Sequence, residues 1–178
     1  MFRIFIALAI SLFSVSAYSQ KPLEYDTVVE CPGINADRIY KNMKVFVAEN
    51  FVSAQNVIQL DDKEDCHIIC KGNIRFEVKN ITWRMLDGVI NFTLDLQAKD
   101  GKYRVAFKNF THENFDKKFG DSWCMGLVCD DVPEGFKKGK KQYKEMQKRA
   151  VPLIIDTMAM MLAKLDACVK SSDKKNDW

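Results

Sequence analysis

The chain has 178 residues, of which 47% are hydrophobic, and a formal net charge of +3 at neutral pH. That length suits one domain with a real hydrophobic core, and the small charge does not favour a polyanionic partner such as nucleic acid. Beyond the N-terminus, no window approaches the ~20 apolar residues that a membrane-spanning helix needs.

Residues 1–20 have the parts of a secretory signal peptide. Arg3 precedes an apolar run over 4–13, and Val15-Ser16-Ala17 has the small-residue pattern of a signal-peptidase site. Because such a segment is removed, we expect a mature chain that begins near residue 21 and has no transmembrane segment. The sequence therefore predicts an exported protein, periplasmic or secreted.

A short strand and a helix are predicted first in the mature chain. Residues 24–30 contain β-branched residues and end at the turn Cys31-Pro32-Gly33. Asn35 is a good N-cap, and apolar residues repeat after it at spacings of three and four. This spacing predicts a helix over 36–51 with one mostly apolar face.

Two β-branched runs, 57–60 and 66–71, lie on either side of the acidic turn 61–65 and predict a hairpin. In residues 71–83, apolar and charged positions alternate, which predicts a further strand.

The strongest pattern is in residues 89–110, where apolar residues alternate on both sides of Asp100-Gly101. This dipeptide favours a two-residue type I′ turn. Only that turn places apolar residues opposite one another, because a register shift of one residue would set apolar against polar. The predicted pairs are Lys99 with Lys102, Ala98 with Tyr103, Leu96 with Val105, and Leu94 with Phe107.

Residues 111–136 show no sustained period, and we predict a long loop there, where proteins of one fold often differ. The loop is unusually apolar, and its apolar residues either cover an open edge of the core or form a partner contact. These candidate contact residues are Phe115, Phe119, Trp123, Met125 and Leu127. Cys124 and Cys129 flank a segment with Gly126, which could let the chain turn back, and they are the candidate disulfide.

A C-terminal helix is predicted over about 140–169, with a kink or a fresh start at Pro152, followed by a frayed polar tail at 171–178. Its apolar face is expected to cover the sheet. Its start is basic, which is typical of a solvated helix face or, alternatively, of contact with an anionic envelope surface. The basic residues are Lys137, Lys138, Lys140, Lys141, Lys144, Lys148 and Arg149.

The order of elements, β-α-β-β-β-β-α, predicts a single α+β domain over 21–170, with a curved antiparallel sheet and two helices packed on one face. The segment 39–51 and the turn 99–104 also resemble a bacterial family of exported domains of unknown function with a TATA-binding-protein-like fold. The resemblance covers about 24–110. It implies the same curved sheet with two helices, and it implies no catalytic residue.

We identify no catalytic, cofactor-binding or metal-binding residues. Cys66, His67 and Cys70 lie close in sequence, but on a strand Cys66 and Cys70 would be about 13 Å apart, too far for one zinc ion. The chain has two histidines, His67 and His112, and neither lies in a known hydrolase motif. We expect His112 to be a surface loop residue.

These observations favour a non-enzymatic exported domain of the cell envelope that binds a protein or ligand partner. The alternative is an enzyme with thiol chemistry in the 111–136 loop. Binding of nucleic acid is suggested only by the fold analogy, and fold alone does not carry function.

Overall fold

The computed structural model describes residues 21–115, 123–133, 136 and 139–171. The remaining residues, which include the predicted signal peptide, Phe119 and the tail from residue 172, lie outside the described residues. The elements are β1 (Tyr25–Glu30), α1 (Ala36–Asn50), α2 (Ala54–Val57), β2 (Ile58–Asp62), β3 (His67–Phe76), the 3-10 helix η1 (Ile81–Leu86), β4 (Gly88–Lys99), β5 (Lys102–Asn114), β6 (Gly126–Leu127) and α3 (Lys140–Lys170). Within the described residues, no helix is both long and apolar enough to cross a membrane.

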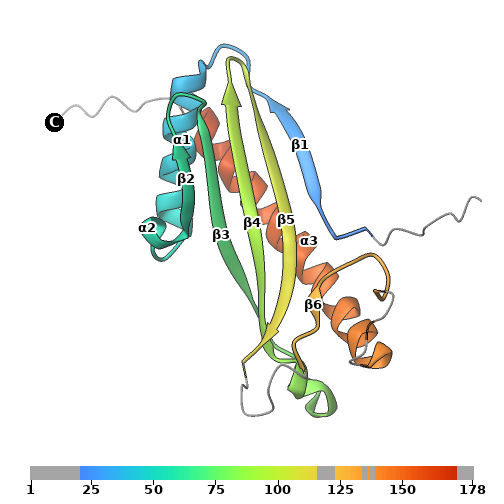
Figure 1. Ribbon diagram of the computed structural model, residues 1–178. Coiled ribbons are helices and arrows are strands. Elements are labelled where there is room, and N and C mark those ends of the chain that lie inside the picture. Colours follow the sequence, from blue (N-terminus) through green and yellow to red (C-terminus); the bar gives the residue numbers. More distant parts are fainter. Residues whose placement is uncertain (1–20, 116–122, 134–135, 137–138, 172–178) are drawn as a thin grey trace, which may run out of the picture.

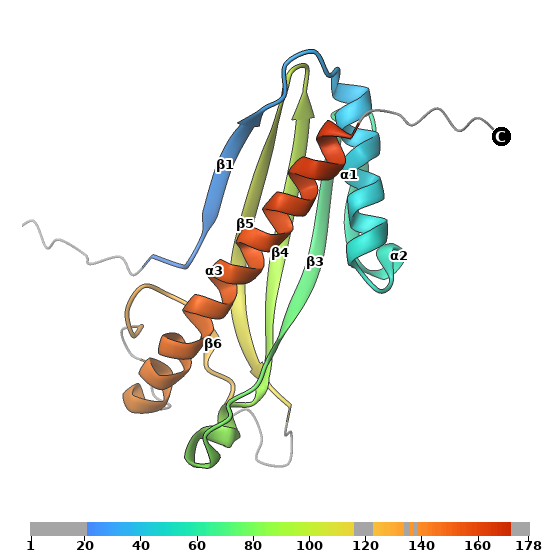
Figure 2. The same ribbon diagram turned by 180° about the vertical axis from the view of Figure 1, so that it is seen from behind.

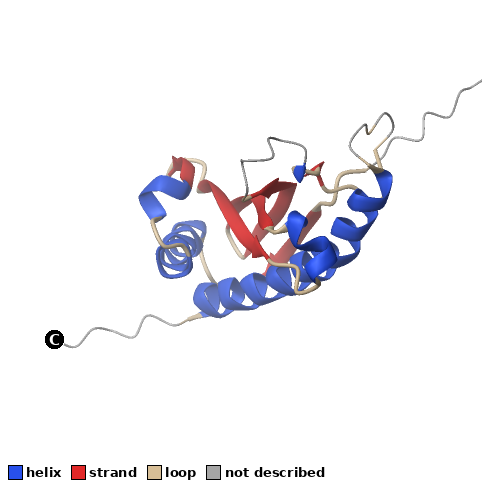
Figure 3. Cartoon of the chain, turned by 90° about the horizontal axis from the view of Figure 1, so that it is seen from below, coloured by secondary structure: helices blue, strands red, loops and turns tan. Residues whose placement is uncertain are grey.

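The strands form one antiparallel sheet in the order β1-β5-β4-β3-β2, and β6 pairs with the far end of β5. Helices α1 and α3 lie on the same face of this sheet, with α3 running diagonally across it (Figures 1 and 2). The view along the strands in Figure 3 shows the long helix α3 passing beneath the sheet. The predicted fold class, α+β with two helices on one face of a curved antiparallel sheet, is confirmed.

The register predicted for the central hairpin is also confirmed, since Lys99 pairs with Lys102 and Leu96 with Val105. The predicted turn type is wrong. Gly101 has a φ of +74°, but Asp100 is not among the described residues with positive φ, and a type I′ turn requires both. The turn is instead shaped by the segment between β1 and α1, because the Gly101 N–H donates to the Ile34 carbonyl and the Asp100 carboxylate accepts from the Ala36 N–H, each at 2.8 Å.

One extra residue in β5 reverses its inward and outward positions. Thr93 pairs with Lys108 and Asn91 with Thr111, so β5 bulges between them, and Asn109 has a φ of +60°. Beyond the bulge, the even-numbered residues point toward the helices. His112 is therefore fully buried in β5, and our expectation of a surface loop residue was wrong.

The predicted hairpin of β2 and β3 is present, but 71–83 does not form a separate strand. β3 continues without interruption to Phe76, and η1 follows after a short connection. Gly72 lies within β3 because the ring of Phe92 occupies the adjacent space, where an added Cβ would come within 2.5 Å of it. Glycine here marks close packing between strands.

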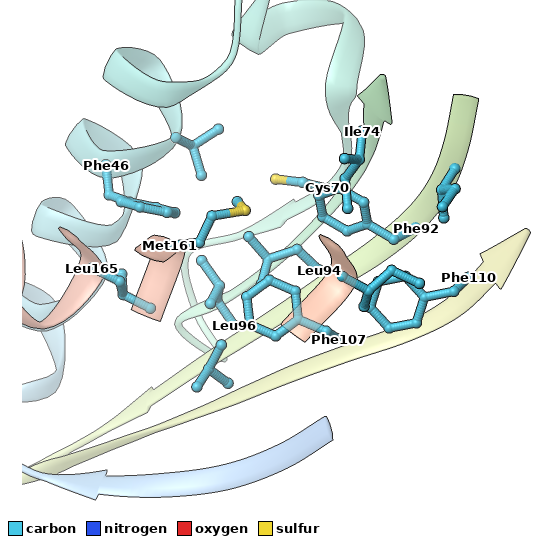
Figure 4. Close-up of a cluster of buried hydrophobic side chains, with 14 of the residues drawn as sticks. Phe46, Cys70, Ile74, Phe92, Leu94, Leu96, Phe107, Phe110, Met161 and Leu165 are labelled. Atoms are coloured by element: carbon cyan, nitrogen blue, oxygen red, sulfur yellow. The ribbon is translucent and has the colours of Figure 1, made fainter. Parts of the chain in front are cut away.

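The helices begin as their sequences predict. The Asn35 side chain accepts the Arg38 N–H at 3.0 Å and caps α1. α3 is one helix of 31 residues that continues through Pro152, so the predicted fresh start does not occur. Figure 4 shows Met161 and Leu165 of α3, with Phe46 of α1, against Leu94, Leu96 and Phe107 of the sheet. The expected role of α3 as the cover of the apolar sheet face is confirmed.

Candidate functional site

The sheet has a second face, on the side away from α1 and α3, and no described helix covers it (Figure 1). Its side chains are the outward members of each strand, and the strand registers align them in rows. One row contains Ile69, Asp95, Ala106 and Asp26, and the next row toward the β4–β5 turn contains His67, Gln97, Arg104 and Val28. On the other side of Asp95 is the row of Lys71, Thr93 and Lys108. We call this surface the open face.

Asp95 is the centre of a charged network on the open face, with a relative exposure of only 6%. One carboxylate oxygen lies 2.8 Å from His67 Nε2, and the other accepts a hydrogen bond from Lys108 Nζ at 2.8 Å. Because the network joins β3, β4 and β5, it fixes charged groups on three strands relative to one another.

Burial by itself would raise the pKa of Asp95, since it disfavours the charged carboxylate. The hydrogen bonds from Lys108 and His67 outweigh that effect and hold the pKa of Asp95 below its ordinary value. The carboxylate is therefore ionised throughout the neutral range, and the network is a fixed arrangement of charges.

Further polar contacts extend the network toward β1. The Gln97 amide lies 3.4 Å from His67 Nε2, and the Arg104 guanidinium donates to both carboxylate oxygens of Asp26, with one bond of 2.9 Å from Nε. Two shallow hollows lie on either side of the network around Asp95. One, of about 230 Å³, is next to Gln97 and Arg104, and the other, of about 380 Å³, is next to Thr93 and Asn109. The open face is therefore hollowed and charged, and it spans the width of the sheet.

The structure separates the contact residues predicted in the 111–136 loop. Met125 is buried, and its N–H donates to His112 Nδ1, while Trp123 packs against the core. Phe115 and Leu127 are exposed, and Phe119 lies outside the described residues. Part of this segment thus covers the edge of the core, which was one of the two expected roles. The predicted start of the loop is wrong, because Thr111 to Asn114 belong to β5.

The described residues contain no disulfide, so the candidate bond between Cys124 and Cys129 is not formed in this structure. The physical reason is that Gly126–Leu127 does not turn the chain back but pairs with β5 as β6. The Asn114 N–H donates to Cys124 Sγ, whereas Cys129 Sγ faces the Leu127 carbonyl.

The buried thiols are not poised for nucleophilic chemistry. Burial raises the pKa of Cys129, and it raises that of Cys70 to about 12. A thiol with a raised pKa remains protonated at neutral pH, and the thiolate is the reactive species. Burial likewise raises the pKa of Cys31, Cys66 and Cys168. These five thiols are therefore poor candidates for nucleophilic chemistry.

His67 and Cys70 lie on opposite faces of β3, with His67 on the open face and Cys70 in the core beneath the helices. The described residues contain no group of three or more potential ligands that could hold a metal ion.

The sequence did not identify the network of Asp95, His67 and Lys108 as a site. The alternation placed Asp95 and Lys108 on the polar face of the hairpin, which was the available signal. Their convergence with His67 depends on the pairing of β3 with β4 and on the side-chain rotamers, neither of which a single sequence shows.

Comparison with known proteins agrees with this architecture. A family model described as a domain of unknown function (DUF4468) with TBP-like fold matches residues 25–113, half of the chain. A TBP-like protein from Parabacteroides distasonis is similar in structure, with a TM-score of 0.55 and 9% identity over 82% of this chain and 93% of that chain. A DUF4468 family protein from Bacteroides ovatus is similar with a TM-score of 0.52 and 15% identity, over 86% of this chain and 90% of that chain. No curated protein matches the chain at a significant level.

Proposed function

The chain belongs to the DUF4468 family of domains of unknown function with a TBP-like fold, and from this premise we propose that it is an exported, non-enzymatic domain of the cell envelope that binds a protein partner on its open face. The observation that carries the proposal is the network around Asp95, a nearly buried carboxylate held between two cationic or polar partners on a sheet face that no described helix covers. Fixed charges on an exposed surface favour recognition, because they need no reordering when a partner binds.

The mixture of charges favours a protein rather than a polyanion. Cations and anions alternate across the open face, since Arg104 lies beside Asp26, Lys108 beside Asp95, and Lys102 pairs across the strands with Glu30. A nucleic acid would be repelled by the carboxylates in these rows, whereas a protein surface can present complementary groups of both signs.

Export is supported by the sequence of residues 1–20. It is tested by fractionating cells that produce a C-terminally tagged chain and measuring the intact mass of the product. The proposal expects an envelope fraction that contains a chain lacking about the first 20 residues. A full-length product confined to the cytosol contradicts export.

Partner binding is tested by chemical cross-linking in intact cells with quantitative mass spectrometry. The double variant K71E/K102E reverses two exposed charges of the open face, and K41E/K164E makes the same change in charge on α1 and α3. We expect one or more proteins cross-linked to the wild type to persist with K41E/K164E and to be lost with K71E/K102E. An equal cross-linking pattern in both variants contradicts a site on the open face, and the absence of any specific product from the wild type contradicts partner binding.

A further inference from the structure

The end of the molecule opposite the β4–β5 turn carries a second surface, distinct from the open face. η1 and the first turns of α3 lie together there (Figures 1 and 2). A direct contact joins them, because Lys141 Nζ lies 5.8 Å from the centre of the Trp83 ring. We call this surface the basal end.

Apolar side chains project into solvent at the basal end. Ile81, at the start of η1, is 80% exposed, and Met85 in its last turn is 41% exposed. Phe115 is 51% exposed and lies next to the last turn of η1, since its N–H donates to the Asp87 carbonyl and the preceding Asn114 side chain donates to the Met85 carbonyl. Exposed apolar residues grouped in this way mark a contact surface more often than scattered ones do.

Cationic side chains surround these apolar residues. Lys79 and Arg84 are exposed beside η1, and Lys140, Lys141 and Lys144 are exposed on α3. The Arg75 guanidinium lies 5.7 Å from the centre of the Phe115 ring. Among the described residues, four acidic groups at this end are Glu77, which pairs with Arg75, Asp87, which accepts the Val78 N–H, Glu113, and Glu145, which pairs with Arg149. Asp130 and Asp131 are exposed in the segment before α3.

The lysines at the start of α3 do not serve the stability of that helix. The dipole favours anions in the first turn and disfavours cations, yet the first turn contains Lys140 and Lys141 and no acidic residue. The Gly139 N-cap makes no side-chain hydrogen bond that would offset this effect. Lys141 has a local partner in the Trp83 ring, and an anionic surface bound at this end would offset the remaining cost to the helix.

We propose that the basal end docks on the surface of an anionic phospholipid membrane. This surface combines exposed apolar side chains, a half-buried tryptophan and several lysines, which is a composition that binds at a bilayer interface. The apolar groups would enter the boundary of the acyl chains, and the lysines would reach the phosphates. Charge complementarity selects this occupant, because phosphatidylglycerol headgroups present the dense negative charge that the lysines match. This docking would leave the open face available for the proposed partner.

The test is co-sedimentation of the full chain with vesicles of phosphatidylcholine alone and with vesicles that contain about one third phosphatidylglycerol. We expect binding to the anionic vesicles only, weakened by added salt. Near a membrane surface, each lysine contributes a factor of about five in binding, so K141Q/K144Q should bind at least about tenfold more weakly than the wild type.

Matched controls make the test specific. K41Q/K63Q removes the same charge from α1 and the β2–β3 turn, outside both the basal end and the open face. V52S removes an exposed apolar residue outside the basal end, and I81S removes one within it. We expect both controls to bind like the wild type and I81S to bind several-fold more weakly. All variants retain residues 1–20, so differences in vesicle binding between the variants come from the substituted residues.

The proposal is overturned if the wild type binds neither vesicle, if it binds both equally, or if K41Q/K63Q weakens binding as much as K141Q/K144Q. It is also overturned if I81S and K141Q/K144Q leave vesicle binding intact but lose a cross-linked protein, because the basal end would then be a protein contact. None of these outcomes depends on the open-face variants, so either proposal can fail alone.

Discussion

Gly101 is the residue whose backbone conformation the central turn requires. Its φ of +74° lies in the region that β-branched residues avoid. Gly101→Val is expected to lower the free energy of unfolding by at least about 1 kcal/mol, measured from the urea midpoint. Gly101→Asn is the control, because asparagine tolerates positive φ, and it should lose less. Equal midpoints for wild type and Gly101→Val would show that the turn does not need this conformation.

His112 gives the protein a stability that depends on pH. Its ring is fully buried, donates from Nε2 to the Leu86 carbonyl and accepts the Met125 N–H at Nδ1, so it is neutral in the folded chain. Burial lowers the pKa of His112 below the ordinary value of 6.5, although the hydrogen bond to Leu86 opposes this shift. Because the unfolded chain binds the proton more readily, the stabilisation is complete above pH 6.5 and is lost as the pH falls through the folded pKa.

His112→Gln keeps a donor and an acceptor but does not titrate. We expect denaturant unfolding at a series of pH values to show the wild type losing up to about 1.4 kcal/mol more than the variant per pH unit below 6.5. Carboxylates titrate in both proteins, so only the difference between the two curves counts. Parallel curves would mean that His112 can be protonated within the fold.

At the scale of elements, α3 stabilises the domain through its buried side chains rather than through its length. Leu165 is 1% exposed and contacts the core, whereas the adjacent Lys164 is exposed. Leu165→Ala is expected to lower the free energy of unfolding by about 2–5 kcal/mol, and Lys164→Ala by less than about 0.5 kcal/mol, both measured by urea denaturation. A small loss for Leu165→Ala would indicate that α3 can separate from the sheet without unfolding it.

Elements with a sustained period were predicted well from the sequence, and changes of period were not. The alternation up to Phe107 gave the hairpin its register, but the bulge at Asn109 exchanged the two faces of β5, so His112 was assigned to the wrong environment. β3 was divided in two at Lys71, although the strand continues to Phe76 and packs Gly72 against the ring of Phe92. α3 continues through Pro152, and its buried side chains on both sides of this residue pack in the one core.

At the scale of the whole molecule, helices and sheet share one hydrophobic core, with no second core in the described residues. Unfolding is therefore expected to be a single cooperative transition, with far-ultraviolet circular dichroism and tryptophan fluorescence giving the same urea midpoint. Two separate midpoints would show that the sheet and α3 are independent units.

The fold class could be predicted because each element's pattern specifies a face that must be buried, and the order of elements leaves few ways to bury all of them. The network around Asp95 could not be predicted in the same way. Its members come from three strands, and each member alone looks like an ordinary polar residue of an exposed sheet face. The basal end was visible only as a basic run, because the exposure of Ile81 and the contact of Trp83 with Lys141 are properties of the packed chain.

The contact between the β4–β5 turn and the segment before α1 has a consequence for folding kinetics. The hairpin is local in sequence and can form early. Its turn is held by the Gly101 N–H, which donates to the Ile34 carbonyl 67 residues earlier, and by the Gly101 carbonyl, which accepts from the Cys31 N–H. Closing so long a loop is entropically slow, and contacts of this kind usually form after the rate-limiting barrier. Asp100→Ala, which removes the bond to the Ala36 N–H, should therefore accelerate unfolding while leaving the refolding rate nearly unchanged in stopped-flow measurements.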